Sequence, residues 1–262
     1  MRKCAPVLLT TLLLAATPST AQVSALDDPT LGGSGRYDNC LLLVRQDAQR
    51  ALNAARDWQK AGGADAATHC AALALVALRR YAEAASTLDT MARDSTESAR
   101  RAELYDQAGN AWLLDRRGDN AQVSFSAAIT FAPRDADLLA DRARAFALKS
   151  DWNGAENDLS AALALSPRRV DLLVLRASAR HALGRKTDAR SDVDQALALK
   201  PSDPDALELR GEMKMEAGDQ AGARADWQAA VDQSPRSDAA AAARQRLNTL
   251  AAPANPPAKP KQ

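Results

Sequence analysis

The stretch ALALKPSDPDALELRGEMKM, residues 196–215, decides the fold of this chain. One helical pattern ends at Pro201, and a second begins directly at Pro204. Proline ends a helix because it lacks a backbone N–H and disfavours helical geometry in the residue before it. The second pattern carries Arg210 on the face where an apolar packing residue is expected. The stretch therefore predicts a seam between two helices, with a charge placed against the core.

The same seam recurs along the chain at a constant spacing. Each pair of consecutive seam prolines encloses two helical segments joined by a polar turn; the prolines are Pro133, Pro167, Pro201 and Pro235. A small residue recurs at one position of each first helix; these residues are Gly109, Ala143, Ala177 and Gly211. A large residue recurs at one position of each second helix; these residues are Phe125, Leu159, Val193 and Trp227. Small positions facing large ones allow two helices to pack closely.

These columns resemble the tetratricopeptide repeat, a helix–turn–helix unit of about 34 residues, which is the spacing of the seam prolines. The best single match is YDQAGNAWLLDRRGDNAQVSFSAAITFAP, residues 105–133. The resemblance implies an all-α fold, an α-solenoid of stacked repeats that forms a right-handed superhelix. Five repeats are expected, with three extra residues in the linker 93–103; their ranges are 65–98, 102–135, 136–169, 170–203 and 204–237.

Residues 1–21 have the pattern of a secretory signal peptide. A basic start, MRK, precedes a short apolar run and a stretch of small residues, so cleavage is expected between Ala21 and Gln22. The run is too short for an ordinary membrane span. Cys4 precedes the run, so a lipid-attached cysteine is not predicted. The pattern predicts export through the Sec-type route, with the periplasm as the expected compartment.

The remaining segments are expected to flank or close the repeats. Residues 22–37 read as a disordered linker, and 38–64 as an atypical capping helix pair with a possible helix start at Asp47. Residues 238–252 predict a C-terminal capping helix, and 253–262 a disordered tail rich in Pro and Lys.

Removal of the signal peptide would leave two cysteines, Cys40 and Cys70. In an exported protein an even pair predicts one disulfide, which would tie the N-terminal cap to the first repeat. The alternative is two buried free thiols.

Three first helices carry an arginine that is matched by an aspartate at a fixed separation, in the second helix of the same repeat. The pairs are Arg142 with Asp158, Arg176 with Asp192, and Arg210 with Asp226. The two earlier repeats lack both partners, as an ion pair between the two helices predicts, because either charge alone would be poorly compensated. The alternative is solvated aspartates beside arginines that lay only their aliphatic stems on the helices.

No pattern in the chain indicates catalysis. A formal charge of +1 gives no general attraction for nucleic acid, and no phosphate-binding loop or nucleophile motif is present. The two histidines, His69 and His181, lie far apart in the sequence without a neighbouring cluster of metal ligands. We therefore expect no enzyme activity, metal or cofactor.

The resemblance implies a concave groove, lined by the first helices, that commonly binds a peptide or helix of a partner. The corresponding positions are Asp106, Asn110, Arg144, Ser178, His181, Asp205, Glu208, Glu212 and Glu216. The last four form an acidic stripe that could receive a basic segment, or could simply keep the last repeat soluble. Asp106 beside Asn110 argues against the carboxylate clamp of chaperone-binding members.

The predicted function is an exported scaffold that binds partner proteins or peptides in this groove, as an adaptor or assembly factor of the cell envelope. A self-associating structural protein and a non-catalytic regulatory subunit of an envelope enzyme complex are the alternatives. A monomer is favoured, without a membrane span after cleavage and without nucleic acid as a partner.

Overall fold

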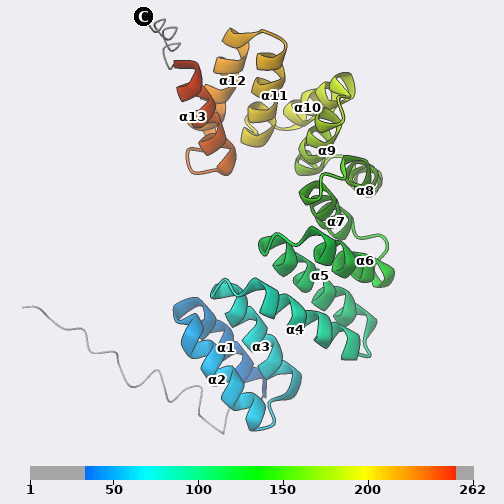
Figure 1. Ribbon diagram of the computed structural model, residues 1–262, viewed down its shortest axis with the longest axis vertical. Helices are drawn as coiled ribbons and strands as arrows, with labels where there is room; N and C mark the ends of the chain where they lie inside the picture. The colour runs from blue at the N-terminus through cyan, green and yellow to red at the C-terminus, as the bar shows by residue number, and fades with distance from the viewer. Residues whose placement is uncertain (1–32, 252–262) are drawn as a thin grey trace, which may run out of the picture. The chain divides into compact units, whose positions relative to one another are not determined.

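The computed structural model describes residues 33–251, and the described part is built of thirteen α-helices without a strand (Figure 1). None of the helices between residues 33 and 251 is long and apolar enough to cross a membrane. Residues 1–32, which include the predicted signal peptide, and residues 252–262, which include the predicted Pro- and Lys-rich tail, lie outside the described residues. The chain divides into two compact units, with the boundary between Ala74 and Leu75.

The N-terminal unit holds α1 (Gly33–Gln46), α2 (Ala48–Lys60) and most of α3 (Ala64–Ala77). The carboxylate of Asp47 caps α2 by accepting from the backbone N–H of Arg50 at 3.0 Å, so the predicted helix start is present. Residues 33–37 belong to α1, whereas the sequence placed them in the linker. The Gly and Ser content of residues 22–37 had favoured disorder, but α1 begins at Gly33 and includes Gly35.

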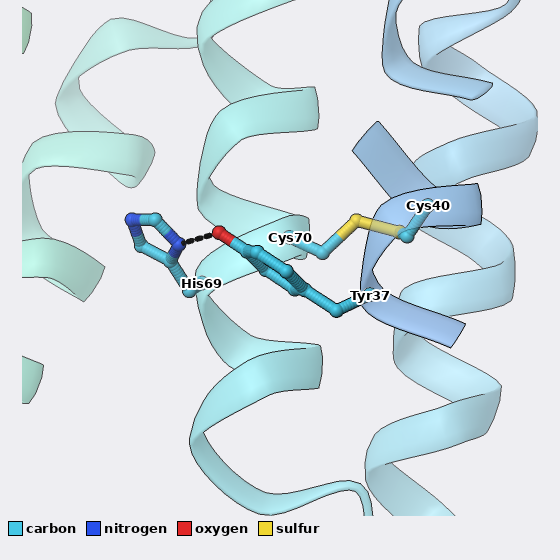
Figure 2. The surroundings of a disulfide bond; sticks show 4 residues. All are labelled: Tyr37, Cys40, His69 and Cys70. Atoms are coloured by element: carbon cyan, nitrogen blue, oxygen red, sulfur yellow. Dashed lines mark hydrogen bonds between the residues drawn. A yellow bond between two sulfur atoms is a disulfide. The ribbon is translucent and has the colours of Figure 1, made fainter. Parts of the chain in front are cut away.

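A disulfide joins α1 to α3 in this unit (Figure 2). Cys40 and Cys70 are fully buried, and their Cα atoms lie 6.3 Å apart. Beside the disulfide, a hydrogen bond of 2.5 Å joins the Tyr37 hydroxyl and Nδ1 of His69, which is 4% exposed. His69 is therefore a buried partner of α1 next to the disulfide.

The second unit consists of helix pairs that follow one another along the chain (Figure 1). Its helices are α4 (Tyr81–Asp94), α5 (Ser98–Leu114), α6 (Gly118–Phe131), α7 (Ala136–Leu148), α8 (Trp152–Leu165), α9 (Val170–Ala182), α10 (Lys186–Leu199), α11 (Pro204–Glu216), α12 (Gln220–Gln233) and α13 (Asp238–Ala251). The pairs α7–α8, α9–α10 and α11–α12 lie within the ranges expected for the last three repeats, and α5–α6 occupies the range before them. Pro204 opens α11, where a missing N–H costs little.

The turn inside each hairpin places one residue in the left-handed region at the same register. The φ angles are +60° at Arg116 and Ser150, +74° at Gly184 and +84° at Gly218, which occupy one position in four successive repeats. The period thus extends to the backbone conformation of the turn. Arg116 and Ser150 adopt it despite their Cβ atoms, which disfavour this region.

Small and large residues face each other across the hairpins as the sequence predicted. A Cβ added to Gly109 would lie 2.6 Å from Cε1 of Phe125, and one added to Gly211 would overlap the indole of Trp227. Where the large residue is Leu159 or Val193, the first helix has alanine instead. The size of the second-helix residue therefore decides whether the first helix needs glycine.

The helix α5 begins at Ser98, ahead of the expected repeat boundary at residue 102. The guanidinium of Arg101 lies 4.5 Å from the centroid of the Phe131 ring, and Tyr105 stacks on the same ring. These contacts order the first turn of α5. The linker expected at 93–103 is therefore largely helix.

Candidate functional site

A groove of about 630 Å³ runs along the first helices of the last repeats. Its walls come from α9, α11 and α13, with one residue from α7. Six predicted groove residues line it, namely Arg144, Ser178, His181, Asp205, Glu208 and Glu212. Its apolar lining is Val174, Leu175, Ala182, Leu209, Ala239 and Ala242. A partly apolar groove with charged groups along it is suited to an extended or helical segment of another chain.

The acidic stripe of α11 is partly neutralised by the capping helix. Nε of Arg246 lies 2.7 Å from Oε1 of Glu208, and its Nη2 donates to Oε2 of Glu212 at 3.0 Å. Burial raises the pKa of Glu208, and the charge of Arg246 opposes that rise. Glu208 and Glu212 are thus intramolecular partners of α13, so two of the four carboxylates of the predicted acidic stripe are already paired within the chain.

The repeat period could have identified Arg246 as the next member of a column of groove residues. The helix α13 begins one repeat length after α11, so it keeps the register of a first helix. Arg246 therefore continues the column of Arg144, Ser178 and Glu212, although the sequence analysis treated α13 as a cap outside the repeats.

Two carboxylates that line the groove remain without a cationic partner in the described chain. Within residues 33–251, neither Asp205 nor Asp238 makes an ion pair, and both line the groove. Burial raises the pKa of Asp205, and repulsion from Asp203 and Asp238 adds to that rise while Lys200 opposes it. A cationic side chain placed here would relieve this repulsion.

Two predicted groove residues lie elsewhere, on α5. Asn110 Nδ2 donates to Oδ1 of Asp106 at 3.0 Å, and neither residue lines the groove. Burial raises the pKa of Asp106, and the charge of Asp141 from α7 raises it further. Asp141 also forms an ion pair with Arg144. Asn110 and Arg144 are therefore held by aspartates of their own chain.

The ninth candidate, Glu216, forms a small polar cluster in the last turn of α11. Its Oε2 lies 2.7 Å from Nζ of Lys186 and 3.2 Å from Nε2 of His181. The hydrogen bond from Lys186 is the main reason that its pKa is lowered. His181, Glu212 and Glu216 each offer one ligand atom within 4.8 Å of the others. The sequence analysis found no ligand cluster at His181 because these neighbours belong to the next repeat.

The three predicted Arg–Asp pairs are formed, each with two hydrogen bonds. The guanidinium of Arg176 donates to both oxygens of Asp192 at 2.9 and 2.7 Å, and Asp192 is 3% exposed. Arg142 with Asp158, and Arg210 with Asp226, repeat this geometry at 2.7–2.8 Å. The aspartates are therefore buried acceptors between the helices.

Additional cations join these pairs. Nη1 of Arg180 lies 2.8 Å from Asp192, and Nζ of Lys214 lies 2.8 Å from Asp226. Arg180 also contacts Glu156 of the preceding repeat at 3.0 Å. The sequence analysis missed Arg180 and Lys214 because Phe146 occupies the same column one repeat earlier, so the column does not read as charged.

Comparison with known proteins finds a family model that matches part of the chain and solved structures that share its fold. The family model for the tetratricopeptide repeat matches residues 141–204 and 175–238. A sequence comparison with curated proteins gives no match.

Solved structures with the same fold include three bacterial proteins. A tetratricopeptide repeat protein of Parabacteroides merdae has a TM-score of 0.64 at 15% identity, over 88% of this chain and 93% of that one. A tetratricopeptide repeat protein of Thermus thermophilus has a TM-score of 0.56 at 19% identity, over 70% and 97%. MamA of Desulfovibrio magneticus has a TM-score of 0.57 at 16% identity, over 66% and 97%.

At these identities the likeness is one of fold. The family model for the tetratricopeptide repeat covers residues 141–238, and the three similar structures show that the fold is an all-α helical-repeat solenoid.

Proposed function

We propose that this chain is an exported scaffold that binds a segment of a partner protein in the groove between α9, α11 and α13. The observation that carries the proposal is the groove itself, which gathers six predicted binding residues on neighbouring first helices. Helical-repeat folds of this type are suited to protein binding and are generally non-catalytic. The partner would be a component of the cell envelope, for which the chain acts as an adaptor or assembly factor.

The chemistry of the groove favours a segment with a cationic residue beside apolar ones. Asp205 and Asp238 offer two open carboxylates, whereas Glu208 and Glu212 are held by Arg246. Leu175, Ala182 and Ala242 supply the accessible apolar contact in the same groove. A Lys or Arg of the partner facing Asp205 would fix the register, and the apolar residues would supply most of the binding energy.

Export is supported by the pattern of residues 1–21 and by the pairing of Cys40 with Cys70, since disulfides persist in oxidising compartments. N-terminal sequencing of the protein recovered from the periplasmic fraction tests this part. The expected first residue is Gln22, and recovery of the uncleaved chain from the cytoplasm would contradict export.

Selection of peptides from a displayed random library tests the groove. We expect the bound peptides to be enriched in Lys or Arg next to apolar residues. Ala242→Trp should weaken binding about tenfold or more, because Ala242 lines the groove and the indole would fill it. Ala241→Trp is the matched control, since Ala241 is exposed on the same helix and does not line the groove.

Replacing both open carboxylates, in Asp205→Asn with Asp238→Asn, should weaken basic peptides selectively and leave apolar ones nearly unchanged. Peptides that bind equally well to the Ala242→Trp variant, or a selection without basic residues, would refute the proposed mode of binding.

A further inference from the structure

We propose that His181, Glu212 and Glu216 form a binding site for a divalent transition-metal ion, with Zn²⁺ as the best fit. One imidazole nitrogen and two carboxylates make up the donor set, and their ligand atoms lie within 4.8 Å of one another. Imidazole and carboxylate together suit Zn²⁺ and its neighbours in the first transition row, whereas Mg²⁺ and Ca²⁺ prefer oxygen ligands alone. The proposal does not rest on the proposed binding of a partner, although two of the ligands also line the groove.

The backbone already positions the three ligands. Glu212 and Glu216 lie one turn apart on α11 and share a face, and His181 lies in the last turn of α9, which contacts α11. Ligand atoms about 2 Å from one Zn²⁺ lie roughly 3–4 Å from one another, so the donors need to close by only about 1 Å. Rotation of the two flexible glutamate side chains can supply that movement.

The site already holds positive charge. The ammonium of Lys186 lies 2.7 Å from Oε2 of Glu216, and Nη2 of Arg246 lies 3.0 Å from Oε2 of Glu212. The Lys186 side chain is 65% exposed, so it can move into water at little cost when an ion replaces it. Arg246 keeps its contact with Glu208 at 2.7 Å after Glu212 turns towards the ion.

The location gives the ion a structural consequence. His181 belongs to the fourth expected repeat, and both glutamates belong to the fifth, so one ion would link the two repeats. Because His181 and Glu212 also line the groove, the ion would lie at its wall.

Calorimetric titration of Zn²⁺ into the untagged full chain tests the site. We expect one strong binding event per chain and a higher thermal midpoint with Zn²⁺ bound. His181→Ala and Glu216→Gln should each weaken the affinity by about tenfold or more, in line with losses seen at metal sites. Lys186→Met should tighten it, because the competing cation is gone while every ligand remains.

Asp57→Asn is the matched control. Asp57 is an exposed carboxylate paired with Lys60 at 2.8 Å, as Glu216 is with Lys186, but it has no histidine ligand beside it in the described chain. This variant should bind Zn²⁺ like the wild type. Absence of Zn²⁺ binding by the wild type, weak binding shared by all variants, or weaker binding by Lys186→Met would each overturn the site.

Discussion

Two hairpins of the same unit solve one packing problem in different ways. Between α9 and α10, Arg176 forms two hydrogen bonds with the buried carboxylate of Asp192. Between α5 and α6, the same two positions hold Ala108 and Ser124, and no ion pair joins them within the described chain.

The carboxylate at the α5–α6 hairpin comes instead from the preceding repeat. Asp89 of α4 accepts from the hydroxyl of Ser124 and from Nε1 of Trp112, both at 2.8 Å. At the later hairpin the column of Asp89 holds Ser160, and Ser160 lies 3.4 Å from Nη1 of Arg176. Asp and Ser have thus exchanged columns, and the arginine is present only where the aspartate lies within its own hairpin. In each of these two hairpins one carboxylate at this level is satisfied, and it comes from either column.

The largest difference between the two hairpins should appear when the acceptor is removed. Asp192→Ala leaves Arg176 and Arg180 without their shared carboxylate, so we expect the free energy of unfolding to fall by about 3 kcal/mol. Ser124→Ala removes one hydrogen bond from Asp89, which keeps Trp112, and should cost about 1 kcal/mol. Urea denaturation measures both, and equal losses would break the comparison.

The match between large and small residues provides the next contrast. Gly109→Ala should destabilise the chain by about 1–3 kcal/mol, because the added methyl overlaps the ring of Phe125. Adding Phe125→Leu should restore part of that loss, since this recreates the Ala143–Leu159 pair of the α7–α8 hairpin. Thermal unfolding of the single and double variants measures the coupling. A Gly109→Ala variant as stable as the wild type would show that α5 and α6 can separate freely.

The smallest expected effect on stability comes from Asp106, a partly buried carboxylate that is not paired with a cation in the described part of the chain, in contrast to Asp226. Burial and repulsion from Asp141 raise the pKa of Asp106 to about 6, whereas the hydrogen bonds and charges of Arg210 and Lys214 outweigh burial and lower the pKa of Asp226. The raised value means that ionised Asp106 destabilises the fold fully above pH 6, and that this penalty disappears below about pH 4.

Asp106→Asn should therefore stabilise the chain at pH 7 by about 1 kcal/mol, allowing for solvent screening, and the gain should vanish as the pH falls to about 4. Asp226→Asn should show the opposite sign at pH 7. The stability that Asp226 contributes is present above its unfolded pKa and is lost as the pH falls through its lower folded value. Urea midpoints across this pH range test both variants, and a gain at Asp106 that is independent of pH would exclude a charge effect.

Much of the fold could be predicted from the constant spacing of the seam prolines and of the packing positions. Pro201 and Gly109 report local backbone and packing requirements that recur once in each repeat, so helix bounds and facing columns could be predicted. The pairs formed by Arg176 and Asp192 were predictable because both partners vary together along the repeats. The partners of Arg246 and His181 were not, because each depends on which side chain of a neighbouring repeat lies opposite, and those positions vary in charge.

The first turn of α5 shows a second limit. The repeat pattern begins at residue 102, but the packing of Arg101 on Phe131 extends the helix to Ser98. Phe131 lies at the far end of the next helix, so a local sequence pattern could not predict this contact or the start of α5.

Four arginines contact the preceding repeat, and these contacts have a consequence for how the chain opens. Arg142 contacts Ser126 at 3.3 Å, Arg176 contacts Ser160, and Arg180 and Arg185 both contact Glu156 of α8. A central hairpin therefore cannot loosen without uncovering charged groups of its neighbour, so opening is coupled from one repeat to the next. Amide hydrogens of α8 and α9 should consequently exchange slowest with solvent, and those of α13, which has a neighbour on one side only, should exchange first.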